Sequence, residues 1–554
     1  MKNILRYTSI VLLFVAANTF GQDNNLDALS KLFSQSNPSG TARFQALGGN
    51  HAALGADVSS ASGNPAGLGF YTRSEFSFTP AFQSTSNGST YITSNKTTGN
   101  SDNFNIANIG VVFGGQQPAY REGWRGNFAI TYSRQNTFYN NTKFSGRNNV
   151  SSVADKFAED VNNDVSDFDL GINDFTKSEV LNNIPNFNNT RHLYYWSFLV
   201  SPTKNTQGNL GFLGTEPSNI SDQKYSFEST GRQSQWNLSY GGTANEKVYL
   251  GFALAIPSFR YESVTKYDEQ YIDSKRFNGL SQTKIYSTDG SGINLSGGVI
   301  IKPNDMLRFG LSLTTPTWYD VNETISSTLK VDVNTAQIGQ NGGGILLPSA
   351  NDAGTLNVIN TLKSRGYSIV DRNGQRFLAG VPTLNTLAFD ANYQLRTPFK
   401  ANIGAAIFFK KKGFISADVE YLAYKGIKMS TENGDRYYSD YTTFVRSDLK
   451  NVLNFKVGGE YRLGQISLRG GYNYQSDPYT LGFDAAGEKL NRSQSIYSGG
   501  VGYRTNEFYV DLTGIYGQST QYYTPYPLAE RKFSPTAKID NSYIKGVVSF
   551  GVFF

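Results

Sequence analysis

The sequence contains no cysteine among its 554 residues, so it has neither a disulfide framework nor a thiolate metal site. Histidine is nearly absent too, with only His51 and His192. Neither has a carboxylate at metal-ligand spacing, and no G-x-S-x-G motif accompanies them. We therefore expect a protein that is not an enzyme and that needs no metal, nucleotide or redox cofactor.

Long apolar runs and one-sided charge are also missing. After the first twenty or so residues no run of about eighteen apolar residues occurs, which excludes a transmembrane helix. The net charge of +6 is small for this length and is not clustered as on a nucleic-acid-binding surface. The one apolar stretch is Ser9–Ala17, which follows Lys2 and Arg6. This pattern is typical of a secretory signal peptide, expected over residues 1–21.

What the chain does contain is aromatic residues, 14% of the total, and 56 glycines, while hydrophobic residues are only 38%. Membrane barrels have such compositions because every second strand residue faces the lumen. A secreted chain without disulfides needs another source of stability, and a closed hydrogen-bonded barrel supplies one.

Apolar and polar residues alternate in steps of two from about residue 74 to the end, as in half-buried strands. For example, Leu453, Phe455 and Val457 alternate with Asn454 and Lys456. A β-sandwich would alternate as well, but its dry core would not accept unpaired charges. Short and long connections also succeed one another, as in outer-membrane barrels. We predict an all-β fold, a fourteen-stranded antiparallel transmembrane β-barrel over residues 73–554. The strands are expected near residues 74–84, 103–115, 124–137, 228–243, 246–268, 280–302, 305–326, 386–409, 412–428, 445–464, 466–478, 492–505, 507–517 and 542–554.

The last strand, Ser542–Phe554, ends the chain on an aromatic residue. A terminal strand ending in Phe is the signal that the outer-membrane barrel assembly machinery reads, so Phe554 is the expected assembly signal. An ordinary edge strand is the alternative.

Several charged residues alternate onto the inner face of three adjacent strands. We expect them either to form a ladder of paired charges that anchors a plug, or to bind a carboxylate headgroup through Lys456 or Arg469. The residues are Asp418, Glu420, Lys456, Glu460, Arg462 and Arg469.

Residues 22–72 differ from the rest because they are rich in Gly, Ala and Ser and lack strand alternation. Small residues allow close packing, so we predict a helical hatch that plugs the lumen. Arg43 and Asp57 flank the small-residue run and are candidates to tether it. A periplasmic tail is the alternative.

Two external loops are expected to be large, near residues 138–227 and 327–385. Short helices are expected around residues 152–161 and in the amphipathic stretch Leu356–Leu362.

The motif G-N-P-A-G-L-G-F at Gly63–Phe70, with A-L-G-G-N-H-A-A-L-G-A-D before it, resembles the hatch of the FadL family. These are outer-membrane transporters of long-chain fatty acids and other hydrophobic molecules, including toluene and xylene. The resemblance extends to Thr397–Phe409 and Ser416–Tyr421. It implies a gating role for Asn64, Pro65 and Ala66. The two large insertions depart from the shorter members.

The resemblance implies a cell-outer-membrane protein of a Gram-negative bacterium. It would take up a fatty acid-like hydrophobic ligand and release it sideways through the barrel wall into the lipid. The resemblance also suggests a monomer. One alternative is a barrel accessory of a protein secretion system or surface assembly that transports no solute. Another is a general porin with an open lumen.

Overall fold

The computed structural model describes residues 33–35, 37–92, 94–115, 123–162, 186–187, 190–204, 210–215, 220–340, 343–431, 436–481 and 489–554. The expected signal peptide, residues 1–21, lies outside the described residues. None of the helices in the described ranges is long and apolar enough to cross a membrane.

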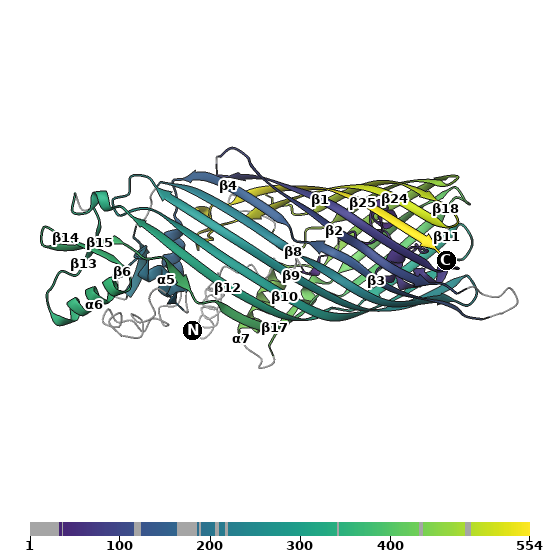
Figure 1. The fold of residues 1–554 in the computed structure, drawn as a ribbon, viewed down its shortest axis with the longest axis horizontal. Helices are drawn as coiled ribbons and strands as arrows, with labels where there is room; N and C mark the ends of the chain where they lie inside the picture. Colours follow the sequence, from purple (N-terminus) through teal and green to yellow (C-terminus); the bar gives the residue numbers. More distant parts are fainter. Residues whose placement is uncertain are drawn as a thin grey trace, which may run out of the picture.

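Most of the described strands form one closed antiparallel barrel, which is drawn in Figure 1. The wall closes where β25 pairs with β1, from Glu75↔Phe553 to Tyr91↔Ala537. The predicted fourteen-stranded barrel is confirmed. In wall order the strands are β1 (Glu75–Tyr91), β2 (Thr97–Phe113), β3 (Arg125–Thr137) continued by β4 (Asn140–Asn148), β8 (Ser221–Thr243), β9 (Val248–Tyr271), β10 (Phe277–Ile301), β11 (Leu307–Thr314) continued by β12 (Trp318–Val333), β17 (Phe389–Arg396) followed by β18 (Lys400–Phe408), β19 (Gly413–Leu422), β21 (Val452–Leu463), β22 (Ile466–Gln475), β23 (Gln494–Arg504), β24 (Phe508–Tyr523) and β25 (Ala537–Phe553).

Two wall strands are interrupted where a proline removes a backbone donor. Pro316 lies between β11 and β12, and Pro398 lies between β17 and β18. Because proline cannot donate to a ladder, a regular strand stops at these positions. The short pieces β16 (Leu384–Thr386) and β20 (Lys428–Ser430) pair with β12 and β17 and extend the same wall.

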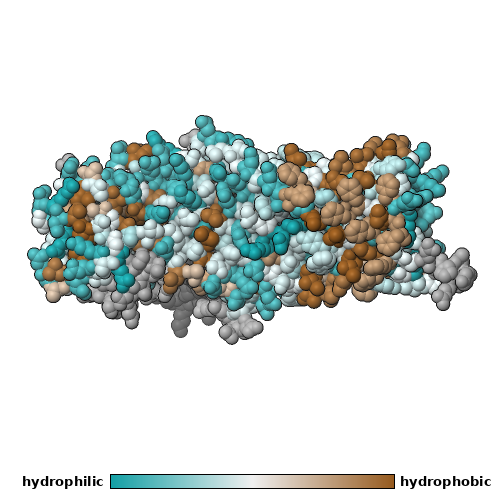
Figure 2. Space-filling model, in the orientation of Figure 1, coloured by the Kyte–Doolittle hydropathy of each residue, from teal (hydrophilic) through white to brown (hydrophobic). Residues whose placement is uncertain are grey.

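Large apolar side chains face outward around one end of the barrel. Figure 2 shows them as a brown band in the part of the view where Figure 1 labels β3, β24 and β25. Strand alternation explains the band, since every second residue of each strand points away from the lumen. On a closed barrel such a surface is stable against lipid. We call it the apolar belt; its members include Phe76, Phe128, Ile130, Leu238, Leu250, Phe252, Leu295, Phe309, Leu311, Ile403, Phe455, Leu468, Leu512 and Phe550.

The barrel continues far beyond the apolar belt. β8, β9 and β10 have 23, 24 and 25 residues, whereas about 9–11 residues span a bilayer. Beyond Ile256 the outward positions of β9 include Arg260, Glu262, Lys266 and Asp268. At about 3.3 Å per residue, residues 257–271 of β9 add about 50 Å along the strand. We call this polar part of the barrel the tower, and the end that carries Glu75 and Phe553 the base.

In the tower, strands occupy much of three segments that were predicted as connections between strands. Residues 85–102, 269–279 and 518–541 lie between predicted strands, yet more than half of them belong to β1, β2, β9, β10, β24 and β25. The predicted loop 138–227 likewise contains β4 and the first seven residues of β8, 221–227. These predictions are wrong because tower strands are polar on the outside and largely polar on the inside. The two-residue hydrophobic pattern used to find strands therefore disappears there.

The other described residues of the two large insertions form a cap at the tower end (Figure 1). One part contains α3 (Val153–Asn162), α5 (Thr190–Trp196) and the hairpin β6–β7 (Val200–Lys204, Leu210–Gly214). The other contains α6 (Ala353–Ser364) and the sheet β13–β15–β14 (Ile345–Leu347, Gln375–Gly380, Ser368–Arg372). The helices expected near residues 152–161 and 356–362 are thus confirmed.

The cap packs its apolar side chains into the mouth of the tower. Phe157 of α3 stacks on Tyr194 of α5, with ring centroids 3.8 Å apart. Both belong to one buried cluster with Phe277 and Leu329 of the tower wall. Helices that would be marginal alone are stabilised by this burial.

Candidate functional site

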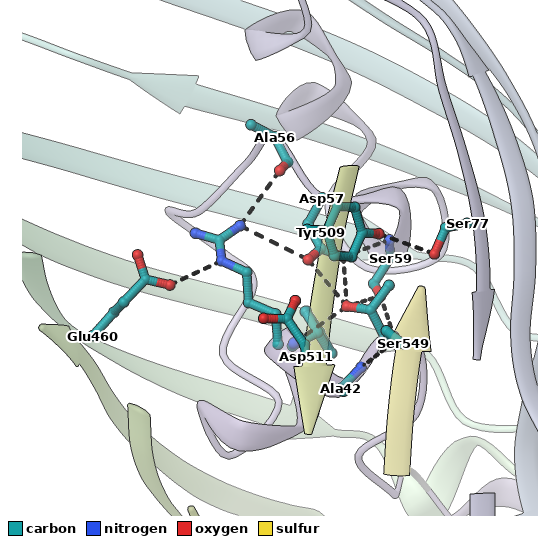
Figure 3. A network of polar contacts seen from close by, with 12 residues as sticks. Ala42, Ala56, Asp57, Ser59, Ser77, Glu460, Tyr509, Asp511 and Ser549 are labelled. Carbon is teal, nitrogen blue, oxygen red and sulfur yellow. Dashed lines mark hydrogen bonds and ion pairs between the residues drawn. The ribbon is translucent and has the colours of Figure 1, made fainter. Parts of the chain in front are cut away.

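The N-terminal segment lies inside the base of the barrel. It contains the short helices α2 (Ala42–Ala46), η1 (Val58–Ala61) and η2 (Pro65–Phe70). The backbone N–H of Ala42 donates to Ser549 Oγ at 2.7 Å, as Figure 3 shows, and its carbonyl accepts from Thr513 Oγ1 at 2.7 Å. On β3, Asn127 Nδ2 donates to the carbonyl of Leu68 at 2.7 Å. We call residues 37–71 the hatch.

Wall glycines let the hatch backbone approach the strands closely. A Cβ atom on Gly310 of β11 would lie 1.7 Å from the carbonyl oxygen of Ala52. A Cβ atom on Gly298 of β10 would lie 1.8 Å from Asn64 Oδ1. Side chains at these inward positions would therefore occupy space that the hatch fills.

The hatch motif Asn64–Ala66 contacts both the segment around Ala52 of the hatch and the barrel wall. Its residues are Asn64, Pro65 and Ala66. Asn64 is fully buried and donates through Nδ2 to the carbonyl of Ala52 at 2.6 Å. Its Oδ1 accepts from the N–H of Ala66 at 3.1 Å, which caps η2, and Pro65 supplies the first residue of that turn. Ala66 packs against Tyr249 and neighbouring wall residues.

Buried charges tie the hatch to β21, β22 and β24. Glu460 accepts hydrogen bonds from Arg43 Nε at 3.0 Å, from Arg469 Nε at 2.8 Å and from Arg462 Nε at 2.7 Å. Arg469 also pairs with Asp511. Arg43 extends from the hatch and reaches the carbonyl of Ala56 as well as Glu460 (Figure 3).

The tether candidates Arg43 and Asp57 lie 3.8 Å apart and belong to the same region. Asp57 accepts from Thr41 Oγ1 at 2.9 Å and caps η1 through the N–H of Ser59 at 2.9 Å. The side chain of Glu460 is 1% exposed, so the three arginines around it replace its hydration.

The remaining candidates on β19 and β21 form a second buried group. Asp418 accepts from the backbone N–H groups of His51 and Ala52 at 2.8 and 2.9 Å. Lys456 pairs with Glu420 at 3.0 Å, and both side chains are at most 5% exposed. Lys456 and Arg469, the two cations considered for a headgroup, are thus each ion-paired with wall carboxylates.

The two histidines lie at opposite ends of the lumen. His51 is in the hatch and its Nδ1 contacts the carbonyl of Gly49 at 3.0 Å, whereas His192 lies on α5 of the cap. Among the described residues no group of three or more His, Asp or Glu could hold a metal ion.

Between hatch and cap the lumen keeps a cavity of about 970 Å³, which we call the chamber. Gln35 and Asn37 line it on the hatch side, and Val153 and Thr190 line it on the cap side. Its walls are rich in tyrosine, with Tyr225, Tyr261, Tyr267, Tyr286 and Tyr543 among the lining residues.

One break in the described part of the wall lies between β2 and β3. Their ladder runs from Phe113↔Phe128 to Asn108↔Ser133 and ends there, although β2 continues to Thr97. The chains approach again further out, where a Cβ atom on Gly99 would lie 2.4 Å from the carbonyl oxygen of Asn141. We call this interval, residues 100–107 of β2 opposite residues 134–139, the β2–β3 window.

The β2–β3 window is bordered by polar side chains on the lumen side and by apolar side chains on the outer surface of the barrel. Only one side-chain hydrogen bond, Thr137 Oγ1 to Asn103 Oδ1 at 3.2 Å, crosses it among the described contacts. The buried side-chain oxygens of Ser101 and Asn105 have no hydrogen-bond partner. On the outer surface beside it, Phe104 is 71% exposed. The β2–β3 window is therefore a stretch of wall without a backbone ladder, beside the upper part of the apolar belt.

A buried carboxylate holds the cap onto the tower. Glu269 of β9 accepts from the N–H of Val153 and the hydroxyl of Ser152 at 3.1 Å each, and from Ser221 Oγ at 2.6 Å. It therefore fixes the start of α3. Burial raises the pKa of Glu269 above its ordinary value, although these hydrogen bonds oppose the rise.

The raised pKa of Glu269 makes cap docking pH-dependent. The docked state binds the proton more tightly than the undocked state, so docking gains stability as pH falls toward about 4.3 and loses it as pH rises. We expect Glu269→Gln to remove this dependence. Hydrogen–deuterium exchange of α3, corrected for intrinsic rates and compared at about pH 5 and about pH 8, measures it. Glu262→Gln, an exposed change on the same strand, is the control; a pH dependence that persists in E269Q contradicts the assignment.

Sequence reasoning did not identify the chamber or the β2–β3 window. The chamber lining comes from residues scattered over more than half of the chain, so no local motif marks it. The β2–β3 window is a missing ladder between two strands whose own sequences are regular, and only the pairing register reveals it.

No protein-family model and no curated protein sequence matches this chain. Among solved structures, a FadL homologue from Pseudomonas aeruginosa is similar at 10% identity and a TM-score of 0.49, covering 93% of this chain and 99% of that one. The P. putida toluene transporter TodX is similar at 11% identity and a TM-score of 0.49, with the same coverage. The monoaromatic hydrocarbon channel CymD gives 11% identity and a TM-score of 0.43, covering 93% of this chain and 98% of that one.

Proposed function

We propose that this protein is a FadL-type outer-membrane transporter that takes up hydrophobic molecules, with long-chain fatty acids as the first substrates to test. The ligand enters through the tower, passes through the chamber and leaves sideways through the β2–β3 window into the lipid around the apolar belt. In this proposal residues 1–21 direct export, Phe554 directs barrel assembly, and residues 22–72 form the hatch.

The β2–β3 window is the observation that carries the proposal. The hatch fills the base of the lumen and is bonded to β25, β3 and β19, which disfavours a straight path through the base. An apolar chain also gains about 0.8 kcal/mol per CH₂ group by staying out of water. A side exit at the height of the apolar belt keeps such a ligand in apolar surroundings, whereas an exit through the base would not.

Uptake of labelled oleate by cells with and without the protein tests the proposal. A higher rate in cells that contain the protein supports it. Equal rates would favour the alternative of a secretion or assembly accessory that moves no solute.

Photo-crosslinking tests the exit. We expect a photoreactive phenylalanine at Phe104, beside the β2–β3 window, to capture a labelled ligand that is leaving the barrel. The same residue at Phe252, which is 64% exposed on the apolar belt at β9, is the matched control. Mass spectrometry of the crosslinked protein measures both. Equal labelling at the two positions would indicate ligand dissolved in the lipid and would argue against a side exit here.

A further inference from the structure

The floor of the chamber is built from neutral amides. We call Gln35, Asn37, Asn136, Gln475 and Gln494 the amide floor; all five line the chamber. Gln35 Nε2 lies 3.4 Å from the side-chain oxygens of both Gln475 and Gln494, and Gln475 Nε2 lies 3.4 Å from Asn37 Oδ1. These three distances exceed the usual 2.9–3.0 Å, so the bonds of Gln35 and Gln475 are weak and can be exchanged for bonds to a ligand. Asn37 and Asn136 are held more firmly, because Asn37 Nδ2 donates to Asn136 Oδ1 at 2.6 Å and Asn136 Nδ2 donates to Gln233 Oε1 at 2.7 Å.

Fixed charge plays little part in the chamber. Among the described lining residues only Lys284, Asp448 and Arg492 are charged, and Lys284 is not without a partner. Arg492 is ion-paired with Asp477 at 3.8 Å and lies over the Tyr479 ring at 4.8 Å. Lys456 is ion-paired with Glu420, and Arg469 is ion-paired with Glu460 and Asp511.

The side walls carry aromatic rings with polar edges. The ring centroid of Tyr261 lies 5.6 Å from that of Phe138, in an edge-on contact, and 6.1 Å from that of Tyr286. The ring centroids of Tyr225 and Tyr523 are 4.8 Å apart. These rings are held by their neighbours and offer apolar faces to a ligand. Most other lining residues carry an amide or a hydroxyl group.

From these features we infer that the chamber selects neutral amphiphiles, molecules that combine an apolar body with hydroxyl or amide groups. A hydrocarbon without a head group would displace water from the amide floor and offer the amides no hydrogen bonds in return. A site built for hydrogen bonds rejects ligands that lack them. A carboxylate would enter without a free cation to balance it. This inference rests on the proposed uptake function and narrows its substrate class.

Three probes with C18 chains separate the possibilities: monoolein with a neutral glycerol head, oleate with a carboxylate, and 1-octadecene with no head group. We expect the purified protein to bind monoolein most tightly and 1-octadecene least tightly. The readout is competition for radiolabelled monoolein. Tighter binding of oleate or 1-octadecene would overturn the inference and leave the uptake function standing. Binding of none of the three would overturn both.

Substitution of the amide floor tests its role. In the double variant Gln475→Leu/Gln494→Leu we expect monoolein to bind at least about tenfold more weakly, because each lost amide removes a hydrogen bond. 1-Octadecene should bind equally or better. Gln375→Leu on the exposed β15 strand of the cap is the control, and heat-modifiable migration in electrophoresis verifies the barrel. A uniform loss for all three ligands in a folded double variant would contradict selection by the amide floor.

Discussion

Replacing Glu460 with glutamine is expected to loosen the hatch and open the base of the lumen to ions. The side chain of Glu460 is 1% exposed and binds Arg43 of the hatch together with Arg469 and Arg462 of the wall. Removing one partner of a buried ion pair typically costs about 3–5 kcal/mol, because the other charge stays buried without compensation. Arg469 keeps Asp511 and Arg462 is partly exposed, so most of the loss falls on Arg43 and therefore on hatch binding.

Ion conductance in planar bilayers measures this opening. The native protein should conduct little, as a filled lumen requires, and E460Q should conduct more. Glu507→Gln, on the exposed turn between β23 and β24, is the control. Arg43→Gln should have the same effect as E460Q, and the double variant should add little, because both changes remove one contact. A conductance of E460Q equal to that of the native protein would mean that this ion pair does not retain the hatch.

The barrel follows from the sequence wherever one face of a strand meets lipid. In β25, Phe550 and Val552 face outward while Val547 and Ser549 face the lumen, and this contrast is visible in the sequence. The tower lacks that contrast: along β9, Arg260 and Glu262 alternate with tyrosine and serine. On β1, β2, β24 and β25 the predicted strands are therefore too short, although the backbone ladder continues. On β9 the predicted strand, 246–268, does extend into the tower.

The candidate site was only partly predictable for a related reason. Alternation places Glu460 and Arg469 on the inner face, and the structure brings them together because they are opposite each other in the β21–β22 register. The partner of Asp418, by contrast, is the backbone of His51 and Ala52 in the hatch, which no strand pattern indicates. The amide floor and the β2–β3 window likewise depend on contacts between segments that lie far apart in the sequence.

An alanine at Gly310 is expected to push the hatch away from β11. The added Cβ atom would lie 1.7 Å from the carbonyl oxygen of Ala52 and 2.3 Å from its carbonyl carbon, and both are backbone atoms that cannot rotate aside. Overpacking of a fitted interior typically costs about 1–3 kcal/mol. The wall is held by ladders on both sides of β11, so the hatch is the part that yields. Asn64 also binds the carbonyl of Ala52, and we expect its contact to be lost in the same step.

Gly514→Ala on β24 separates this effect from the loss of a glycine. No atom lies within 4 Å of a Cβ atom at Gly514, so alanine there should be neutral or slightly stabilising, by about 0.4–1 kcal/mol. Conductance and the protease sensitivity of the hatch in the two variants give the comparison. Because the two changes are chemically identical, a higher conductance in G310A alone would locate the hatch against β11. Equal behaviour of both variants would place the hatch elsewhere, and the side exit would then lose the seal at the base on which it depends.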